Sequence, residues 1–466
     1  MAVKIACLVP HPPVLIPEVG GAEISRILAT KNAMNDLAKE MAGLPPMTFV
    51  FISPHSPAFA DAFAIKTRKT FQGSMSRFGA AEVAFCPEND IELAAMILSK
   101  ARSTNIPVCE FGEALIDQGY SDQLDHGVLV PLYYFKEAFH GLMISLSISD
   151  LSYFKHYLFG RAIQEAADEM GRDIALVASG DLSHRLTPSA PAGYSERGKD
   201  FDKSIEEILQ KGSFEDLFSI DETLIKDAGE CGFRSILVLA GALNGYRVET
   251  KVFSYEGPFG VGYMIAMARP IKKERERDMV ERVEEFLAAQ KEKSLSGESG
   301  PVKLARRAVE EYVKKGCLIS APGDLPTFLL EESGAVFVCL KKDGVLRGCI
   351  GTTTSTEPNL AGETIKNAVH AATRDPRFPA VEPEELADLR YTVDILEKPE
   401  EISDESLLDP RKYGVIVESG FRRGLLLPDI EGVDLVKQQV EIAKQKAGIA
   451  PTEQVKLYRF KVTRYH

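Results

Sequence analysis

One stretch of the sequence divides this chain and limits what it can fold into. Ile271 to about Lys293 are mostly charged with helical spacing, and Ser294 to Pro301 are small, polar and rich in glycine and serine. The first pattern is typical of a solvated helix or a partner-binding helix, and the second of a flexible linker. A chain of 466 residues is also too long for one ordinary core. The sequence therefore predicts two domains, residues 1–270 and 301–466, joined by a charged helix and linker at residues 271–300.

The composition excludes several classes of partner. A formal net charge of −13 disfavours nonspecific binding to nucleic acid and docking on an anionic membrane. No apolar run approaches the ~18 residues that a membrane-spanning helix needs, and no targeting segment is visible. The 7 cysteines are odd in number and form no CxxC pair, which is typical of reduced thiols. We therefore expect a cytoplasmic protein that binds neither nucleic acid nor membrane.

The first domain alternates strand-like and helix-like segments. Apolar runs of strand length occupy Ile5–Val9, Phe49–Ile52, Gly141–Ile148 and Ile174–Ala178. Helical spacing occupies Ile24–Met41, Glu92–Ala101 and Tyr157–Glu169. This alternation predicts an α/β domain around a largely buried sheet.

The second domain has a different pattern, which predicts an α+β fold. Amphipathic spacing predicts helices over Leu304–Val313 and Asn359–Ala372. The predicted strands are Val336–Leu340, Val345–Ile350, Thr392–Glu397, Gly414–Glu418 and Leu425–Leu427. The pair Asp343-Gly344 is a strong signal for a two-residue hairpin turn between the first two strands.

Four polar segments of the first domain each carry a histidine, although the whole chain has only 8. His11 and His55 come just past predicted strands, His184 lies a few residues past another, and His126 follows Asp125. Ligands and catalytic groups of open α/β sheets gather at the carboxyl edge of the strands. Neutral imidazole is a common metal ligand and a frequent general base. The spacing therefore favours convergence on one site, although each histidine alone is also consistent with a strand cap or a loop residue.

A third metal ligand is expected from the turn before the apolar helix Ile236–Leu243. Two histidines and a carboxylate, here Glu230, leave open positions for O₂ and substrate, as in non-heme Fe(II) oxygenases. A thiolate, here Cys231, shifts the preference toward zinc, copper or thiolate-tolerant iron. The sequence leaves both residues open, and either is also consistent with a structural role.

The same segments resemble the class III extradiol dioxygenases, a LigB-like family, and its Memo-like branch. The matching segments are Pro10–Pro13, Ser53–Pro57, Asp125–Gly127, Gly180–His184 and Glu230–Gly232. The resemblance implies a three-layer α/β/α fold for residues 1–270. It also implies His11 and His55 as iron ligands, His184 as the acid/base and His126 as a substrate-pocket residue. In the Memo-like branch the third metal position is a cysteine before a glycine, like Cys231.

One further residue of these segments, Asp181, has an expected role in the site. Asp181 lies three residues before His184 and is expected to orient or charge-stabilise its imidazole.

The second domain resembles the AMMECR family, whose biochemical role is not established. The matching segments are Leu346–Gly351, Asn367-Ala368, Ala371-Ala372, Arg374–Phe378, Gly424–Pro428 and Lys446–Ile449. Cys349 near Arg347 is a candidate nucleophile. The alternative is that Cys349 packs in a strand whose glycines allow close backbone approach. The resemblance implies that the AMMECR domain is one part of a system with a Memo-like protein and a radical SAM protein.

These observations lead to three functional hypotheses. The first is an Fe(II)-dependent, extradiol dioxygenase-like oxidoreductase that acts on a catecholic or related aromatic substrate with O₂. The second is a metal-binding adaptor that lacks ring cleavage and works with a radical SAM protein. Metal-dependent hydrolysis at the same site is the third.

Overall fold

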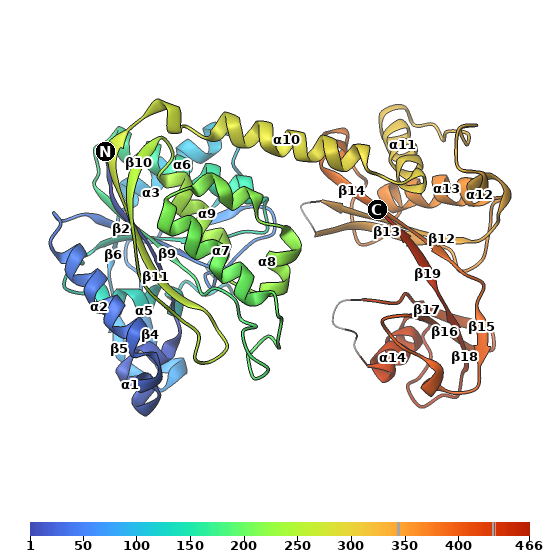
Figure 1. Cartoon of the computed structure of the whole chain (residues 1–466), viewed down its shortest axis with the longest axis horizontal. Helices are drawn as coiled ribbons and strands as arrows, with labels where there is room; N and C mark the ends of the chain where they lie inside the picture. Colours follow the sequence, from blue (N-terminus) through green and yellow to red (C-terminus); the bar gives the residue numbers. More distant parts are fainter. Residues whose placement is uncertain (343–344, 431–432, 434) are drawn as a thin grey trace. The chain divides into compact units, whose positions relative to one another are not determined.

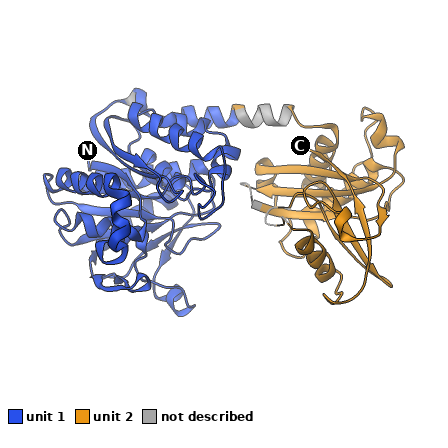
Figure 2. Cartoon of the chain, turned by 60° about the horizontal axis from the view of Figure 1, so that its bottom comes forward, with its two compact units in different colours: residues 1–288 blue, residues 289–466 orange. Residues whose placement is uncertain are grey.

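The computed structural model describes residues 1–342, 345–430, 433 and 435–466, with no side-chain description at residues 275, 290–296 and 345. Two compact units divide the chain, Met1–Ala288 and Ala289–His466 (Figure 2). The predicted hairpin turn at Asp343-Gly344 lies outside the described residues. Among the described residues, no helix is both long enough and apolar enough to cross a membrane.

Unit 1 is built on a nine-stranded sheet in the order β10-β11-β1-β9-β2-β8-β3-β7, with β6 pairing β8. Its strands are β1 (Val3–Val9), β2 (Thr48–Ser53), β3 (Phe63–Lys66), β6 (Glu88–Asn89), β7 (Val108–Phe111), β8 (Leu142–Ser147), β9 (Ile174–Ser179), β10 (Tyr246–Glu256) and β11 (Tyr263–Lys273). The central strands β1, β9, β2 and β8 are parallel, and β10 and β11 add an antiparallel edge. A separate hairpin joins β4 (Gly73–Met75) to β5 (Ala80–Phe85).

Helices cover both faces of this sheet (Figure 1). They are α1 (Pro17–Gly20), α2 (Leu28–Ala42), α3 (Ile91–Ser103), α4 (Glu113–Asp117), α5 (His126–Phe135), α6 (Tyr153–Met170), α7 (Gly198–Lys211), α8 (Glu222–Ala228) and α9 (Phe233–Ala242). Short 3₁₀ turns occupy Pro13–Leu15, Gly21–Ile27, Ser76–Phe78, Phe214–Ser219 and Arg275–Arg277.

The two faces of the sheet have separate cores, because successive strand residues point to opposite sides. Val50 and Ile52 of β2 join a core with α3, α6, α7 and α9, whereas Phe49 and Phe51 join a core with α2 and α5. Unit 1 is therefore a three-layer α/β/α domain, which confirms the predicted fold class.

The junction after unit 1's sheet differs from the expected charged helix. Strand β11 continues through Lys273, because Lys272 and Lys273 pair with Arg247 and Tyr246 of β10. The helix of this region, α10, spans Val280–Ser296, and the next helix begins at Gly300. The helix thus starts later than predicted and takes in the first residues of the expected linker.

Unit 2 is an α+β domain with two antiparallel sheets, in the orders β13-β12-β14-β19 and β15-β18-β16-β17. Its strands are β12 (Ala335–Lys342), β13 (Val345–Gly351), β14 (Leu389–Leu396), β15 (Glu400–Ile402), β16 (Gly414–Ser419), β17 (Arg422–Leu426), β18 (Lys456–Phe460) and β19 (Val462–Tyr465). Its helices are α11 (Gly300–Lys315), α12 (Thr327–Glu331), α13 (Leu360–Thr373) and α14 (Val436–Lys446), with 3₁₀ turns at Pro383–Asp388 and Glu405–Leu407. Helices α11 and α13 share the core of the first sheet, and α14 that of the second.

One cysteine pair of unit 2 corrects the expectation that all thiols are reduced. Cys339 of β12 and Cys349 of β13 form a disulfide, whereas Cys7, Cys86, Cys109, Cys231 and Cys317 are free. The two residues lie directly opposite each other on adjacent strands, with Cα atoms 4.1 Å apart. Their separation of 10 residues therefore becomes a cross-strand contact.

Candidate metal centre

Neighbouring parallel strands bring the histidine segments to one edge of the sheet. His11 follows β1, His55 follows β2, and the loop from Gly180 to His184 follows β9, which lies between them. Because parallel strands end at the same edge, residues more than 100 positions apart in the sequence become neighbours. Cys231 reaches the same place from the turn before α9.

Two imidazoles and a thiol face one another at this edge. The Nε2 atoms of His11 and His55 are 3.0 Å apart, and the Sγ of Cys231 is 3.6 Å from Nε2 of His11. These three donor atoms all lie within 4.8 Å of one another. The other ring nitrogen of His11, Nδ1, contacts the hydroxyl of Ser179 at 2.8 Å, which fixes the ring and leaves Nε2 for a ligand.

Burial keeps the two imidazoles in the neutral form that binds a metal, whereas it keeps the thiol of Cys231 protonated. Burial lowers the pKa of His11, and the nearby His55, His126 and His184 lower it further. Burial also lowers the pKa of His55, against an opposing effect of Asp125. The thiol of Cys231 has a pKa raised by burial, so it would lose its proton only when a cation replaces it. Two neutral imidazoles and a displaceable thiol proton fit a divalent or monovalent transition metal.

Glu230 lies beside this cluster but uses its carboxylate elsewhere. Its Oε2 accepts a hydrogen bond from the backbone N–H of Phe233 at 2.5 Å, at the start of α9. Burial raises the pKa of Glu230 to about 7, which marks a carboxylate shielded from solvent. Among the described residues, the sets of donors close enough to share an ion include Cys231 and not Glu230.

Asp181 and His184 flank the same thiol. Their donor atoms and the Sγ of Cys231 also lie within 4.8 Å of one another. The Oδ1 of Asp181 accepts the backbone N–H of His11 at 3.0 Å, and burial raises the Asp181 pKa to about 7. No hydrogen bond joins Asp181 to the His184 imidazole in the part of the chain that the structure describes. The Nε2 of His184 is buried with no hydrogen-bond partner there, so its hydrogen-bonding capacity is unused within the described residues.

Two residues without a sequence signal hold the loop of Asp181 and His184 in place. Asp202 of α7 accepts the backbone N–H of Ser183 at 2.8 Å and the hydroxyl of Tyr255 at 2.6 Å. Asp202 sits within a charged helix and Tyr255 on a mixed-polarity strand, and neither belongs to a motif. Their role in holding the loop is visible only in the folded structure, where Asp202 accepts hydrogen bonds from both Ser183 and Tyr255.

Comparison with known proteins identifies both units. Residues 5–266 match the family described as the catalytic LigB subunit of aromatic ring-opening dioxygenase. The chain belongs to this LigB family. Residues 302–465 match the AMMECR1 family, so a LigB domain and an AMMECR1 domain are fused in one chain.

Relatives share this organisation or one part of it. A Clostridium acetobutylicum protein is 38% identical over 98% of both chains. A Thermotoga maritima protein is 55% identical over 36% of this chain and 98% of its own length. A crystal structure of an uncharacterized Pyrococcus horikoshii protein is 39% identical, covers 35% of this chain and 88% of its own, and has a TM-score of 0.33.

A cleft of the LigB domain reaches His55, one member of the donor cluster. It has a volume of about 580 Å³ and is lined by His55, Pro57, Ser74, Ser76, Arg77, Phe78, Tyr120, Ser121, Gln123, Leu124, Asp125, His126 and Leu129. The ring of His126, the first residue of α5, stacks on His55 with centroids 4.2 Å apart. Asp125 fixes this corner, because its carboxylate accepts the hydroxyls of Ser53 and Ser56 at 2.6 and 2.7 Å.

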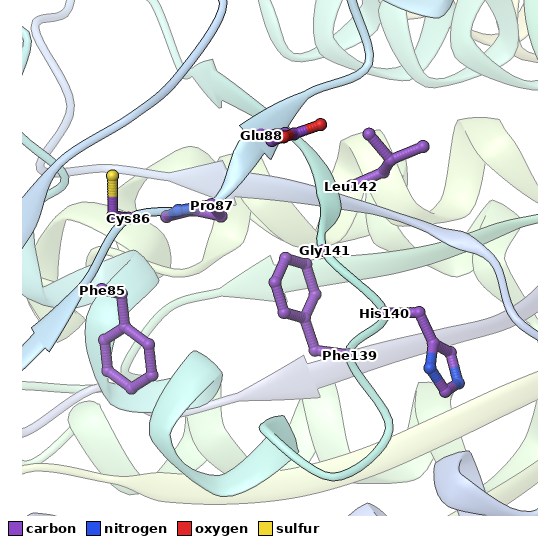
Figure 3. Close-up of a pocket in the computed structure, with 8 residues that line it drawn as sticks. All are labelled: Phe85, Cys86, Pro87, Glu88, Phe139, His140, Gly141 and Leu142. Carbon is purple, nitrogen blue, oxygen red and sulfur yellow. The ribbon is translucent and has the colours of Figure 1, made fainter.

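Another hollow of the LigB domain, about 430 Å³, contains none of the predicted site residues. It is lined by Phe85, Cys86, Pro87, Glu88, Phe139, His140, Gly141 and Leu142 (Figure 3). Strands β6 and β8 begin there, so this hollow lies at the edge opposite the donor cluster.

In the AMMECR1 domain the candidate nucleophile Cys349 is paired with Cys339. Arg347 is paired with the carboxylate of Glu385 at 2.8 Å. A Cβ atom on Gly348 would lie 2.1 Å from the Ala371 carbonyl oxygen, so this glycine allows β13 to approach α13 closely. Asp375 and Arg377 of the segment that follows α13 form an ion pair at 2.7 Å.

Proposed function

We propose that the LigB domain holds one Fe(II) ion on His11, His55 and Cys231 and catalyses an O₂-dependent oxidation of a small aromatic substrate, with copper as the alternative redox-active metal. Zinc has no redox chemistry and would fit the same donors only in a function that does not use O₂. The observation that carries this proposal is the meeting of two Nε2 atoms and one Sγ within 4.8 Å beside an open cleft. A bound redox-active metal would supply the one-electron chemistry with O₂ that amino-acid side chains lack. The thiol of Cys231 stands where the two-histidine iron oxygenases have a carboxylate.

The cleft supports an aromatic substrate. Phe78, Tyr120 and His126 line it and present ring surfaces, and the ring of Phe78 lies 5.4 Å from that of His126. A volume of about 580 Å³ is ample for a single-ring molecule and would also admit a larger one. Hydroxyl groups of Ser74, Ser76 and Ser121 add hydrogen-bonding partners for a polar substituent.

His184 is proposed as the acid/base of this reaction. Its buried Nε2 has no partner among the described residues, and burial lowers its pKa, so the ring is neutral and ready to accept a proton. One ring nitrogen of His184 lies within 4.8 Å of the Sγ of Cys231, which supports a place for this imidazole beside the proposed metal. His126 is proposed to contact the substrate ring, because it lines the cleft and stacks on His55.

Oxygen consumption by the reconstituted full chain tests this proposal. The chain is purified anaerobically, loaded with Fe(II) and mixed with catechols or aminophenols, while an oxygen electrode records uptake. We expect His184→Gln to retain the metal and lose at least ~100-fold in rate. The matched control is His140→Gln, at the opposite edge of the sheet, which should behave as wild type. Absence of O₂ uptake with every substrate tested would contradict the oxidase function.

A second candidate function follows from the thiol ligand. Cys231 in place of a carboxylate favours a metal-holding adaptor of the Memo-like kind, which would work with a radical SAM partner. This function predicts stable metal binding without turnover. It also predicts that a radical SAM protein is retained by the immobilised full chain and lost when His11 and His55 are replaced by alanine.

A further inference from the structure

The cysteine pair of the AMMECR1 domain lies on an accessible part of the fold. Val336, Val338 and Leu340 of β12 point into the domain core, so Cys339, between them, points to the other face of the sheet. Both cysteines are only partly buried. Cys349 also lies on β13, which is the edge strand of its sheet. A thiol can therefore approach the disulfide from solvent.

Charged groups surround Cys349 in a fixed arrangement. Its backbone N–H donates to Asp375 Oδ2 at 2.9 Å, and the Arg377 guanidinium contacts both Asp375, at 2.7 Å, and the Cys349 carbonyl, at 3.5 Å. Lys446 is the last residue of α14. Its pKa is lowered mainly by burial and secondly by the positive charge of Arg377, which lies nearby. The contacts with Asp375 and Arg377 fix the backbone of Cys349 and keep its strand position defined.

Each cysteine is held in place whether or not the bond exists. Adjacent strands pair Cys339 with Cys349, and the same register pairs Val338 with Ile350 and Phe337 with Gly351. The Phe337 ring lies over Gly351, where a Cβ atom would come within 2.1 Å of it. The two sulfurs would therefore remain neighbours after reduction, ready to pair again.

We propose that Cys339 and Cys349 form a redox-active pair that exchanges electrons with thiols, a thiol–disulfide exchange site on the AMMECR1 domain. The thiolate of an incoming thiol attacks one sulfur, forms a mixed disulfide and releases the other cysteine as a thiolate, which takes up a proton. A second thiol then resolves the mixed disulfide. Two thiols are oxidised to one disulfide, and the cysteine pair gains two electrons and two protons. The proposal is independent of the metal centre.

Equilibration in glutathione buffers tests the proposal on the intact chain. After incubation at graded ratios of reduced to oxidised glutathione, free thiols are trapped by alkylation, and peptide mass spectrometry measures the Cys339–Cys349 linkage. We expect the linkage to pass from nearly complete to nearly absent across the series, with the slope of a two-electron couple. A parallel arm with reduced thioredoxin and its reductase distinguishes a protein thiol from a small one as the donor.

Single cysteine-to-serine variants test the exchange reaction at each sulfur separately. Cys339→Ser should trap glutathione on Cys349, and Cys349→Ser should trap it on Cys339. The matched control is Cys317→Ser, which removes an exposed, unpaired thiol of the same unit and should leave the transition unchanged. A linkage that never forms in the most oxidising buffer, or that persists with both reductants, would overturn the proposal.

Discussion

The contact between Gly180 and Gly232 allows a direct test of how the fold assembles the donor cluster. A Cβ atom on Gly180 would lie 2.2 Å from the Cα of Gly232, whereas ordinary contacts begin at 3.4 Å. Both partners are backbone, so no side chain can rotate away, and the two segments must separate by about 1 Å. Gly180 begins the loop of Asp181 and His184, and Gly232 follows Cys231. The separation would therefore pull the thiol away from the loop.

We expect Gly180→Ala to destabilise the LigB domain by ~1–3 kcal/mol, the usual range for overpacking. Fe(II) affinity should fall at least ~10-fold, as when the supports of a metal site are disturbed. The matched control is Gly43→Ala, where an added Cβ would lie 3.6 Å from its nearest neighbour. Thermal unfolding and anaerobic Fe(II) titration measure the two effects. A Gly180→Ala chain that matched Gly43→Ala in both assays would refute the reasoning.

Two further predictions concern the supports of the site. Burial raises the pKa of Asp202 from 3.8 to about 6, so its contribution to stability is fully present below about pH 4 and is lost as the pH rises through about 6. The difference in free energy of unfolding between wild type and Asp202→Asn should therefore shift by up to ~3 kcal/mol between about pH 4 and 7. Urea unfolding at graded pH checks this, and a constant difference would contradict it. Ser179→Ala should weaken Fe(II) binding ~10–100-fold by freeing the His11 ring. Ser145→Ala should not, because that buried hydroxyl has no hydrogen-bond partner among the described residues.

The buried strands of the LigB domain could be predicted because each is apolar on both faces. Every residue of β2 and β9 is buried, and their segments Phe49–Ile52 and Ile174–Ala178 appear in the sequence as uninterrupted apolar runs. The histidines then follow the strand ends directly, and the parallel order of β1, β9 and β2 gathers them. This is why the positions of His11 and His55 could be expected before the fold was known.

Edge elements carried much weaker signals. Most residues of β10 alternate between exposed and partly buried, and β3 and β7 have only 4 residues each. Lys272 and Lys273 belong to strand β11 because they pair with β10, although the charged composition of this segment predicted a helix. Pairing with a partner strand outweighs local composition there.

The disulfide was not predicted, because the hairpin of β12 and β13 contains a register shift. Lys342 pairs with Val345 and Lys341 with Leu346, a register that would put Gly348 opposite Cys339. A bulge between Leu340 and Lys341 shifts the pairing by one residue and brings Cys349 there instead. Sequence spacing alone does not reveal such a shift.

The proposal of Cys231 rather than Glu230 as third ligand likewise depended on the fold. The two residues are adjacent and partly buried, and both have side chains that can bind a metal. Only the geometry shows the Glu230 carboxylate bonded to the N–H of Phe233 while the Cys231 thiol faces His11.

The metal content of two variants tests the proposed centre most directly. Wild type, Cys231→Ala and Glu230→Gln are reconstituted anaerobically with Fe(II), freed of excess metal and analysed by elemental mass spectrometry. The proposed centre predicts that Glu230→Gln, which keeps an oxygen to accept the N–H of Phe233, retains the wild-type metal content. Cys231→Ala should lose most of it. Loss of metal from Glu230→Gln together with full retention by Cys231→Ala would contradict a centre built on His11, His55 and Cys231.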